Sequence, residues 1–231
     1  MTRVTGFDLN SLVHCIKRGA FGMDIFKDKS DYWRFVRLLY LCNDEFQDHN
    51  VARSEVTSKL FVRPPHWPER KPLTDIVSWC AMPNHFHLLL CEKREGGIGK
   101  FMQRLGGSFT KGFNIKYSNQ GSPFQAKYKP VILTEDSHLH HLIPYINVKN
   151  VMELYPHGGL RGAIEHYDDA WKWAKTYEFS SFKTFALGLS SPILAMDTIH
   201  SMEYPNSELS FKAQAKECIE INLTKDNPFG E

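Results

Sequence analysis

Two histidines separated by one residue, His85 and His87, are the side chains of this sequence best suited to chemistry. They stand in an apolar run that favours a β-strand, and successive side chains of a strand point to opposite faces of its sheet. His85 and His87 should therefore share one face, while Phe86 and Leu88 pack on the other. Two imidazoles on one face can bind one divalent metal ion, but a His-x-His pair also occurs as a purely structural feature.

A tyrosine further along the chain, Tyr145, is the second candidate. The apolar residues of the predicted helix around it are Leu139, Leu142, Ile143 and Ile146. Tyr145 lies off that stripe, which predicts an accessible phenol, and Pro144 should kink the helix just before it. A phenol with a pKa of about 10 is a weak nucleophile unless a metal activates the attacked phosphate or a base takes the proton. A surface tyrosine without a chemical role is the alternative.

Basic residues gather in the middle of the chain although the net charge is only +2. Between Lys93 and Pro130 there are eight Lys and Arg residues and one acid, Glu95. Lys100, Arg104 and Lys111 fall on one face of a predicted helix, opposite its apolar residues. A local positive surface of this kind suits phosphate binding, and a solvated helix face is the alternative.

Composition places the chain among ordinary globular proteins, with 42% hydrophobic and 23% charged residues in 231. No run reaches the roughly 18 apolar residues of a membrane span, and the segment 1–10 has no signal-peptide core, so we expect a cytoplasmic protein and no membrane partner. The five cysteines are scattered without a Cys-x-x-Cys pair, which argues against a disulfide framework and a cysteine zinc site. The sequence does not decide between a monomer and a dimer.

The order of predicted elements is β-α-β-β-α-β followed by a helix. The expected strands are 12–17, 76–81, 85–91 and 128–133, and the expected helices begin at Ser30 and span 98–117 and 137–155. A proline-rich loop is expected at 64–72. This order predicts an α+β, ferredoxin-like split βαβ fold, an antiparallel sheet with two helices on one face, plus a C-terminal helix that carries the tyrosine. We expect one domain over 1–187 and a polar, less regular extension over 188–231.

A metal site, a nucleophile and a phosphate-binding surface together describe a nucleic-acid phosphodiester transfer enzyme. A metal activates the phosphate, the tyrosine attacks it, and the basic helix follows the sugar-phosphate backbone. This function is our hypothesis from the residues alone.

The segment 82–90 resembles the His-hydrophobic-His motif of single-tyrosine transposases, in particular the REP-associated tyrosine transposases of bacteria. The resemblance continues in collinear order from about Leu12 to Leu187. It includes the opening strand and first helix at 13–19, 25–28 and 31–32, the second helix and following strand at 109–114 and 121–129, the tyrosine segment 145–150 and the aromatic, double-serine segment 177–182.

The resemblance implies a metal-dependent endonuclease and strand transferase that binds single-stranded DNA near hairpins and uses Mg²⁺ or Mn²⁺. It implies that Tyr145 attacks a phosphodiester, leaving a 5′-phosphotyrosine and a free 3′-hydroxyl, and that His85 and His87 hold the metal. We add Arg18 and Lys149 to the predicted DNA contacts.

This chain departs from the family at the third metal ligand. The family carries Asn or Gln four residues after the tyrosine, where this chain has Lys149. An ammonium cannot ligate a metal. Three alternatives follow. Either Asn150 becomes the third ligand through a local shift, or Lys149 contacts phosphate directly, or metal binding is weakened.

Two rival interpretations remain. A cupin or a histidine-triad hydrolase would share fragments of the histidine motif, but cupins are all-β barrels and the triad position is Leu89. A non-catalytic protein that holds hairpin DNA or RNA with the same fold is the stronger rival, supported by Lys149.

Overall fold

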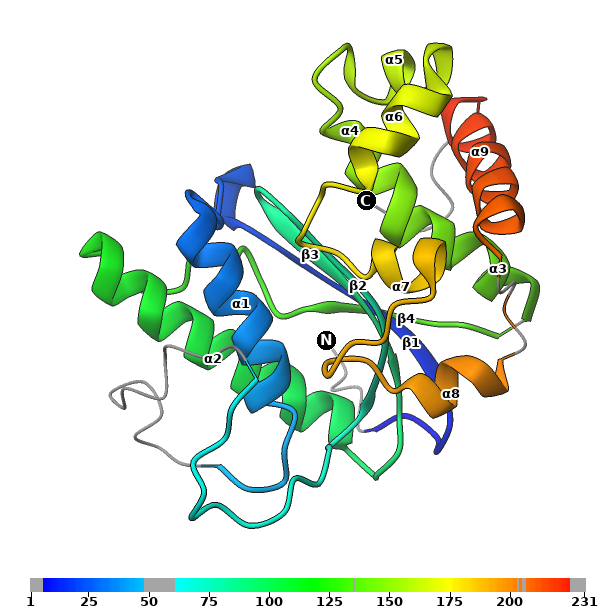
Figure 1. The fold of residues 1–231 in the computed structure, drawn as a ribbon. Coiled ribbons are helices and arrows are strands. Elements are labelled where there is room, and N and C mark those ends of the chain that lie inside the picture. The colour runs from blue at the N-terminus through cyan, green and yellow to red at the C-terminus, as the bar shows by residue number, and fades with distance from the viewer. Residues whose placement is uncertain (1–5, 48–60, 135, 203, 205–206, 225–231) are drawn as a thin grey trace.

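A four-stranded antiparallel sheet forms the centre of the molecule (Figure 1). The computed structural model describes residues 6–47, 61–134, 136–202, 204 and 207–224, so the start of the predicted domain at 1–5 and the end of the predicted extension at 225–231 lie outside the described residues. The strands are β1 (Leu12–Arg18), β2 (Asp75–Met82), β3 (His85–Cys91) and β4 (Lys129–Ile132). Their order, β2-β3-β1-β4, is that of the ferredoxin-like plan, which confirms the predicted fold class.

The register of the strands decides which side chains share a face. Residues directly opposite one another in an antiparallel pair point to the same side. Ile16 and Cys80 both lie opposite His87, and Arg18 and Met82 both lie opposite His85. We call the face that carries His85 and His87 the site face. His14, two residues before Ile16, also belongs to it.

Two helices cover the opposite face of the sheet (Figure 1). They are α1 (Lys29–Leu41) and α2 (Gly97–Tyr117). Phe35 of α1 packs on Phe86 with 4.8 Å between ring centroids, so the residue between the two histidines points away from the site face, as predicted. Between α1 and β2, the described part of the proline-rich loop contains no helix or strand.

The predicted helix around Tyr145 is present but is not a regular α-helix. It consists of α3 (Asp136–Pro144), a π-helical turn η3 (Tyr145–Lys149) and α4 (Asn150–Glu153). This assembly covers the site face of the sheet. The turn that carries Tyr145 therefore has a geometry that apolar periodicity does not reveal.

The remaining helices are α5 (Gly159–Glu165), α6 (Tyr167–Ala174), α7 (Phe182–Leu187), α8 (Met196–Ser201) and α9 (Glu208–Thr224). They pack around that assembly, except that α8 lies against β2 (Figure 1). Helix α9 contacts α3, η3 and α7, and Phe211, Ala215 and Ile219 on it are fully buried. Where the structure describes it, the segment expected as a polar extension thus contributes to the same core. The boundary at Leu187 stays a prediction.

All five cysteines are buried and free. Among the described residues, no helix combines the length and the apolar character needed to cross a membrane.

Candidate functional site

Three histidines meet on the site face. The ring centroids of His85 and His87 are 4.8 Å apart, and His14 Nε2 lies 2.9 Å from His87 Nδ1. His85 Nδ1 lies 2.6 Å from Asn84 Oδ1. Because Nδ1 is engaged in both His85 and His87, Nε2 is the ring nitrogen that each would offer to a metal. The structure confirms that the pair shares a face, and it adds His14.

The structure brings Tyr145 to these histidines. Its ring centroid lies 5.8 Å from that of His87 and 6.4 Å from that of His14. The side chain is 0% exposed, so the prediction of an accessible phenol is wrong. The reason is that the tyrosine helix lies between the sheet and α9, which leaves the polar side of this turn facing the sheet instead of water.

The π-helical turn changes the spacing after Tyr145. The backbone N–H of Asn150 donates to the carbonyl of Tyr145, five residues back, where an α-helix would use the residue four back. In terms of backbone hydrogen bonds, the residue one turn beyond Tyr145 is Asn150 and not Lys149. Such single π-turns are frequent at functional sites. This is the local shift that would let Asn150 replace the missing ligand.

Lys149 lies against the tyrosine. Its Nζ is 4.6 Å from the centroid of the Tyr145 ring and 2.6 Å from Glu153 Oε1. The ammonium is therefore held beside the phenol ring by a carboxylate one turn further along. Its charge favours an anion at this place, whether a phenolate or a phosphate.

A buried hydrogen-bond network fixes the π-turn on the sheet. Asn147 Nδ2 donates to Ser78 Oγ at 2.7 Å, and Ser181 Oγ donates to Asn147 Oδ1 at 2.7 Å. Ser181 also accepts from the Trp79 backbone N–H at 2.9 Å, along the outer edge of β2. The double-serine segment therefore holds the tyrosine turn in place. Nothing in local sequence periodicity identifies these partners, because the segments are distant in sequence.

The side chain of Asn150 is buried, and among the described residues neither its Oδ1 nor its Nδ2 has a hydrogen-bond partner. An orphaned buried amide is costly and points to a missing ligand such as a water or an ion. An amide oxygen and two imidazoles suit a divalent cation of intermediate hardness such as Mn²⁺, whereas Mg²⁺, a hard cation, would fit only with several waters completing its coordination. No group of three His, Cys, Asp or Glu residues in the described part of the chain could hold a metal.

Cys80 is opposite His87 on β2 but is a poor ligand. Burial raises the pKa of its thiol well above the usual range, the Glu153 carboxylate adds to the rise, and the Lys149 ammonium opposes it. Burial therefore disfavours the thiolate, which is the form that metals bind.

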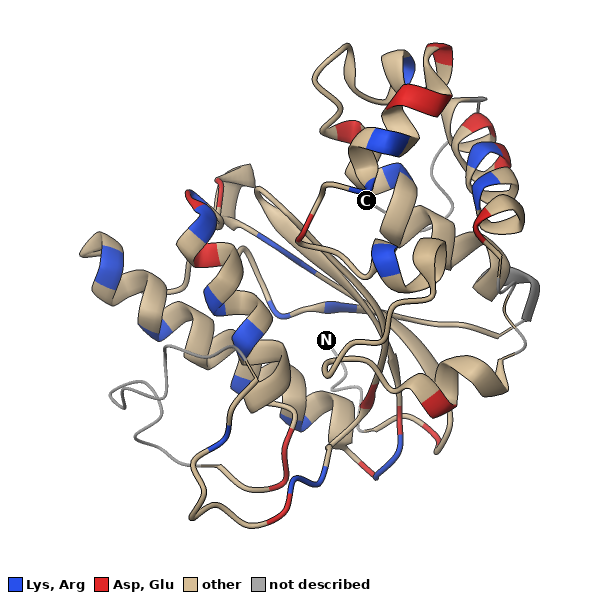
Figure 2. Cartoon of the chain, in the orientation of Figure 1, with Lys and Arg blue, Asp and Glu red and all other residues tan. Residues whose placement is uncertain are grey.

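The predicted DNA contacts lie on two sides of the sheet. Arg18 is opposite His85 on the site face, whereas Lys100, Arg104 and Lys111 are on α2, across the sheet. Arg104 donates to the backbone carbonyls of Asp44 and Glu45, which gives it a structural role. Lys and Arg are spread over helices on both sides (Figure 2).

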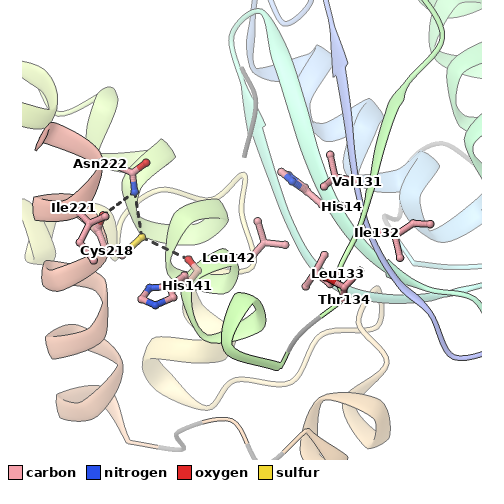
Figure 3. Close-up of a pocket in the computed structure, with 10 residues that line it drawn as sticks. All are labelled: His14, Val131, Ile132, Leu133, Thr134, His141, Leu142, Cys218, Ile221 and Asn222. Carbon is pink, nitrogen blue, oxygen red and sulfur yellow. Dashed lines mark hydrogen bonds between the residues drawn. The ribbon is translucent and has the colours of Figure 1, made fainter. Parts of the chain in front are cut away.

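A cavity of about 280 Å³ opens beside His14 (Figure 3). In the close-up, His14 and Val131 reach out from the sheet toward His141, Cys218 and Asn222 on α3 and α9. His14 thus lines this mostly apolar cavity and also contacts His87 through its Nε2.

Comparison with solved structures finds a likeness to a REP-associated tyrosine transposase bound to a REP hairpin, with 13% identity and a TM-score of 0.45. The likeness covers 84% of this chain and 90% of that chain. That protein comes from the family that the sequence motifs resemble. The fold follows from the strand order of this chain itself, and at this TM-score the likeness decides nothing about activity. No family model matches the sequence, and no curated protein does.

Proposed function

We propose that the protein is a metal-dependent single-stranded DNA endonuclease and strand transferase that acts near hairpins through Tyr145. The observation that carries this proposal is the meeting of Tyr145 with His87, at 5.8 Å between ring centroids, on a π-turn that belongs to a different segment of the chain. A nucleophile and metal-binding side chains in contact are what phosphodiester transfer requires. The hairpin and the single strand come from the sequence resemblance.

Tyr145 supplies the nucleophile. Its phenolic oxygen forms a bond to phosphorus, the bond from phosphorus to the 3′-oxygen breaks, and the phenolic proton is balanced by the one that the 3′-oxygen gains. The products are a 5′-phosphotyrosine and a free 3′-hydroxyl. Lys149, with its Nζ 4.6 Å from the ring centroid, stabilises the phenolate as the proton leaves.

His85, His87 and Asn150 would hold the cation. When bound, Mg²⁺ or Mn²⁺ would polarise a phosphoryl oxygen and orient the leaving group. His14 Nε2 contacts the Nδ1 of His87, and Asn84 Oδ1 contacts the Nδ1 of His85. These contacts fix both ring orientations before a metal arrives, which lowers the cost of binding.

The burial of Tyr145 adds one requirement to the proposal. A phosphodiester has to reach a phenol that is 0% exposed, so the turn η3 and the elements that cover it must move apart when DNA binds. The hydrogen bonds of Asn147 to Ser78 and Ser181 are the contacts that such a movement would break or carry along.

The deciding experiment is cleavage of a single-stranded hairpin oligonucleotide with Mn²⁺. The wild-type protein should cleave and form a covalent adduct visible in denaturing gels, and Tyr145→Phe should bind the same DNA without cleaving. Tyr177→Phe is the matched control, since it removes a phenol that donates to the Ala81 carbonyl away from the histidines. Cleavage by Tyr145→Phe at the wild-type rate would refute the assignment.

The second candidate is a hairpin-binding protein without catalysis. The full burial of Tyr145 favours it, because a buried phenol does not meet a phosphodiester, and Glu153 already neutralises the Lys149 charge. Wild-type protein that binds hairpin DNA or RNA tightly but yields no adduct at any Mn²⁺ concentration would support this function instead.

A further inference from the structure

Phe21 presents its side chain entirely to solvent. It lies in the short turn η1 (Ala20–Gly22) that follows β1, and its backbone is left-handed, with φ 53° and ψ 27°. Single exposed apolar residues are common, but a bulky side chain in this backbone region is rare and costs free energy. The chain thus keeps a phenyl ring outside its core at a position where glycine or asparagine would be less strained.

The turn is rigidly tied to its surroundings. Gly19 N–H donates to the Asn84 carbonyl at 2.7 Å, and Ala20 N–H donates to the Pro123 carbonyl at 2.8 Å. A Cβ on Gly19 would lie 2.1 Å from the Met23 carbonyl oxygen, so the path of the turn is closely packed. The backbone that carries Phe21 is therefore held from two sides, by the Asn84 and Pro123 carbonyls.

This turn is connected to the site through one residue. Asn84 Nδ2 donates to the Gly22 carbonyl at 3.4 Å, while Asn84 Oδ1 lies 2.6 Å from His85 Nδ1. Arg18, opposite His85, lies directly before the turn. Phe21, Arg18 and the candidate ligand His85 thus lie at the same end of the sheet, joined through β1 and Asn84.

We infer that Phe21 is a stacking platform for one unpaired nucleobase of the DNA strand at the site. The inference rests on the proposed function and adds the place where the strand is held. A flat exposed ring stacks on any base, whereas bases within a duplex already have both faces covered by their neighbours. Phe21 therefore selects single-stranded DNA and contributes affinity without reading sequence, while Arg18 suits the adjoining phosphate.

The test measures binding of a fluorescein-labelled single strand by anisotropy, with chelator present so that no cleavage occurs. Phe21→Ala keeps the Cβ and removes the ring, and should raise Kd by about 5- to 150-fold, the range expected when one base stack is removed. Phe21→Tyr should bind like wild type. The matched control is Leu209→Ala, which removes another exposed apolar side chain, on α9, and should leave Kd unchanged.

Abasic substitutions in the oligonucleotide identify the partner of the ring. One abasic position should weaken wild-type binding as much as Phe21→Ala does, and should cause no further loss in that variant. Equal abasic losses in both proteins, or a Kd unaffected by Phe21→Ala, would overturn the inference and leave the proposed function standing. Wild-type protein that binds no single strand would refute both this inference and the proposed function. An oligomer that dissociates on Phe21→Ala, without a change in DNA affinity, would mean that Phe21 contacts another protein chain instead.

Discussion

At the scale of single residues, the site depends on which side chain stands one turn after Tyr145. The extra residue of the π-turn brings the Asn150 backbone N–H to the Tyr145 carbonyl and leaves Lys149 against the tyrosine ring. Under the proposal, Asn150 therefore takes the place of the ligand that the sequence resemblance implies at position 149, and Lys149 acts through its charge. Asn150, whose buried amide lacks a partner in the described part of the protein, is the third ligand under the proposal.

Calorimetric titration of Mn²⁺ tests this assignment. Asn150→Ala should weaken binding by about tenfold or more, because one of three protein ligands is removed. Lys149→Gln should tighten binding modestly, since a positive charge near the cation is removed. If Asn150→Ala binds Mn²⁺ as well as wild type does, the third ligand lies elsewhere or is water.

His14 should act on the metal through His87. Its Nε2 lies 2.9 Å from His87 Nδ1, so His14→Leu removes the contact that fixes the tautomer of His87. We expect Mn²⁺ affinity to fall by about tenfold to a hundredfold in His14→Leu and to recover partly in His14→Gln, whose amide can still hydrogen-bond. His141→Leu, on the other wall of the same cavity, is the control and should leave the affinity unchanged. Long-range ¹⁵N spectra of the imidazoles would report the His87 tautomer directly, and an unaltered tautomer in His14→Leu would contradict this role.

At the scale of elements, the helix α1 begins at Lys29, just before the start predicted at Ser30. Asp28 caps the helix in a capping box with Asp31, and Lys116 at the end of α2 lies 2.6 Å from the Asp28 carboxylate. The hydrogen bond from Lys116, with a further one from Ser30, holds the pKa of the Asp28 carboxyl well below its usual range. This ion pair ties the start of one helix to the end of the other.

The linkage to pH follows from the direction of that shift. A carboxyl whose pKa is lower in the folded protein stabilises the fold at pH values above its unfolded-state pKa of 3.8. This stabilisation is lost as the pH falls toward the pKa of the carboxyl in the folded protein. Asp28→Asn keeps a good cap but removes the charge, so it should lower Tm at pH 7 and approach the wild-type Tm in strong acid. Asp169→Asn, which breaks an exposed pair with Lys172, should change Tm little at either pH. A constant Tm difference across the pH range would show that the charge of Asp28 is not what stabilises the helix start.

The strands and α2 were predictable within one or two residues because their apolar residues recur with the period of a strand or of a helix. The placement of His85 and His87 on one face follows from the period of two in a strand. Tyr145 was assigned to the wrong environment because its burial depends on α9, a helix far along the chain. His14 and Asn147 were missed for a related reason, since strand register and side-chain networks join segments distant in sequence. A π-turn leaves no signature in apolar spacing at all.

At the scale of the whole molecule, the sheet separates two chemical environments. The site face holds the histidines, Arg18 and the tyrosine turn, and the described part of the chain after Leu187 packs behind that turn through α9. The basic residues of α2 are on the other side of the sheet. One short strand at the site would contact Arg18 and Lys129 of the site face without reaching α2.

This separation predicts unequal effects of charge removal on DNA binding. Arg18 and Lys129 belong to the site face, since Arg18 is opposite His85 and Lys129 is opposite Ile16. In Arg18→Gln/Lys129→Gln, the slope of log K against log salt for a short single strand should shrink by about 0.7 for each phosphate that the protein no longer neutralises.

The matched double variant is Lys100→Gln/Lys111→Gln on α2. It removes the same amount of charge from exposed positions across the sheet, and Arg104 is left intact because it holds the carbonyls of Asp44 and Glu45. We expect it to change the slope less than the site-face variant does, because only the site-face pair can lie along a strand whose phosphate is at Tyr145. Equal changes of the slope in the two variants would mean that the DNA passes around the edge of the sheet to α2, as the basic stripe alone predicts. A larger change in the α2 variant would place the principal DNA surface on the side away from the histidines.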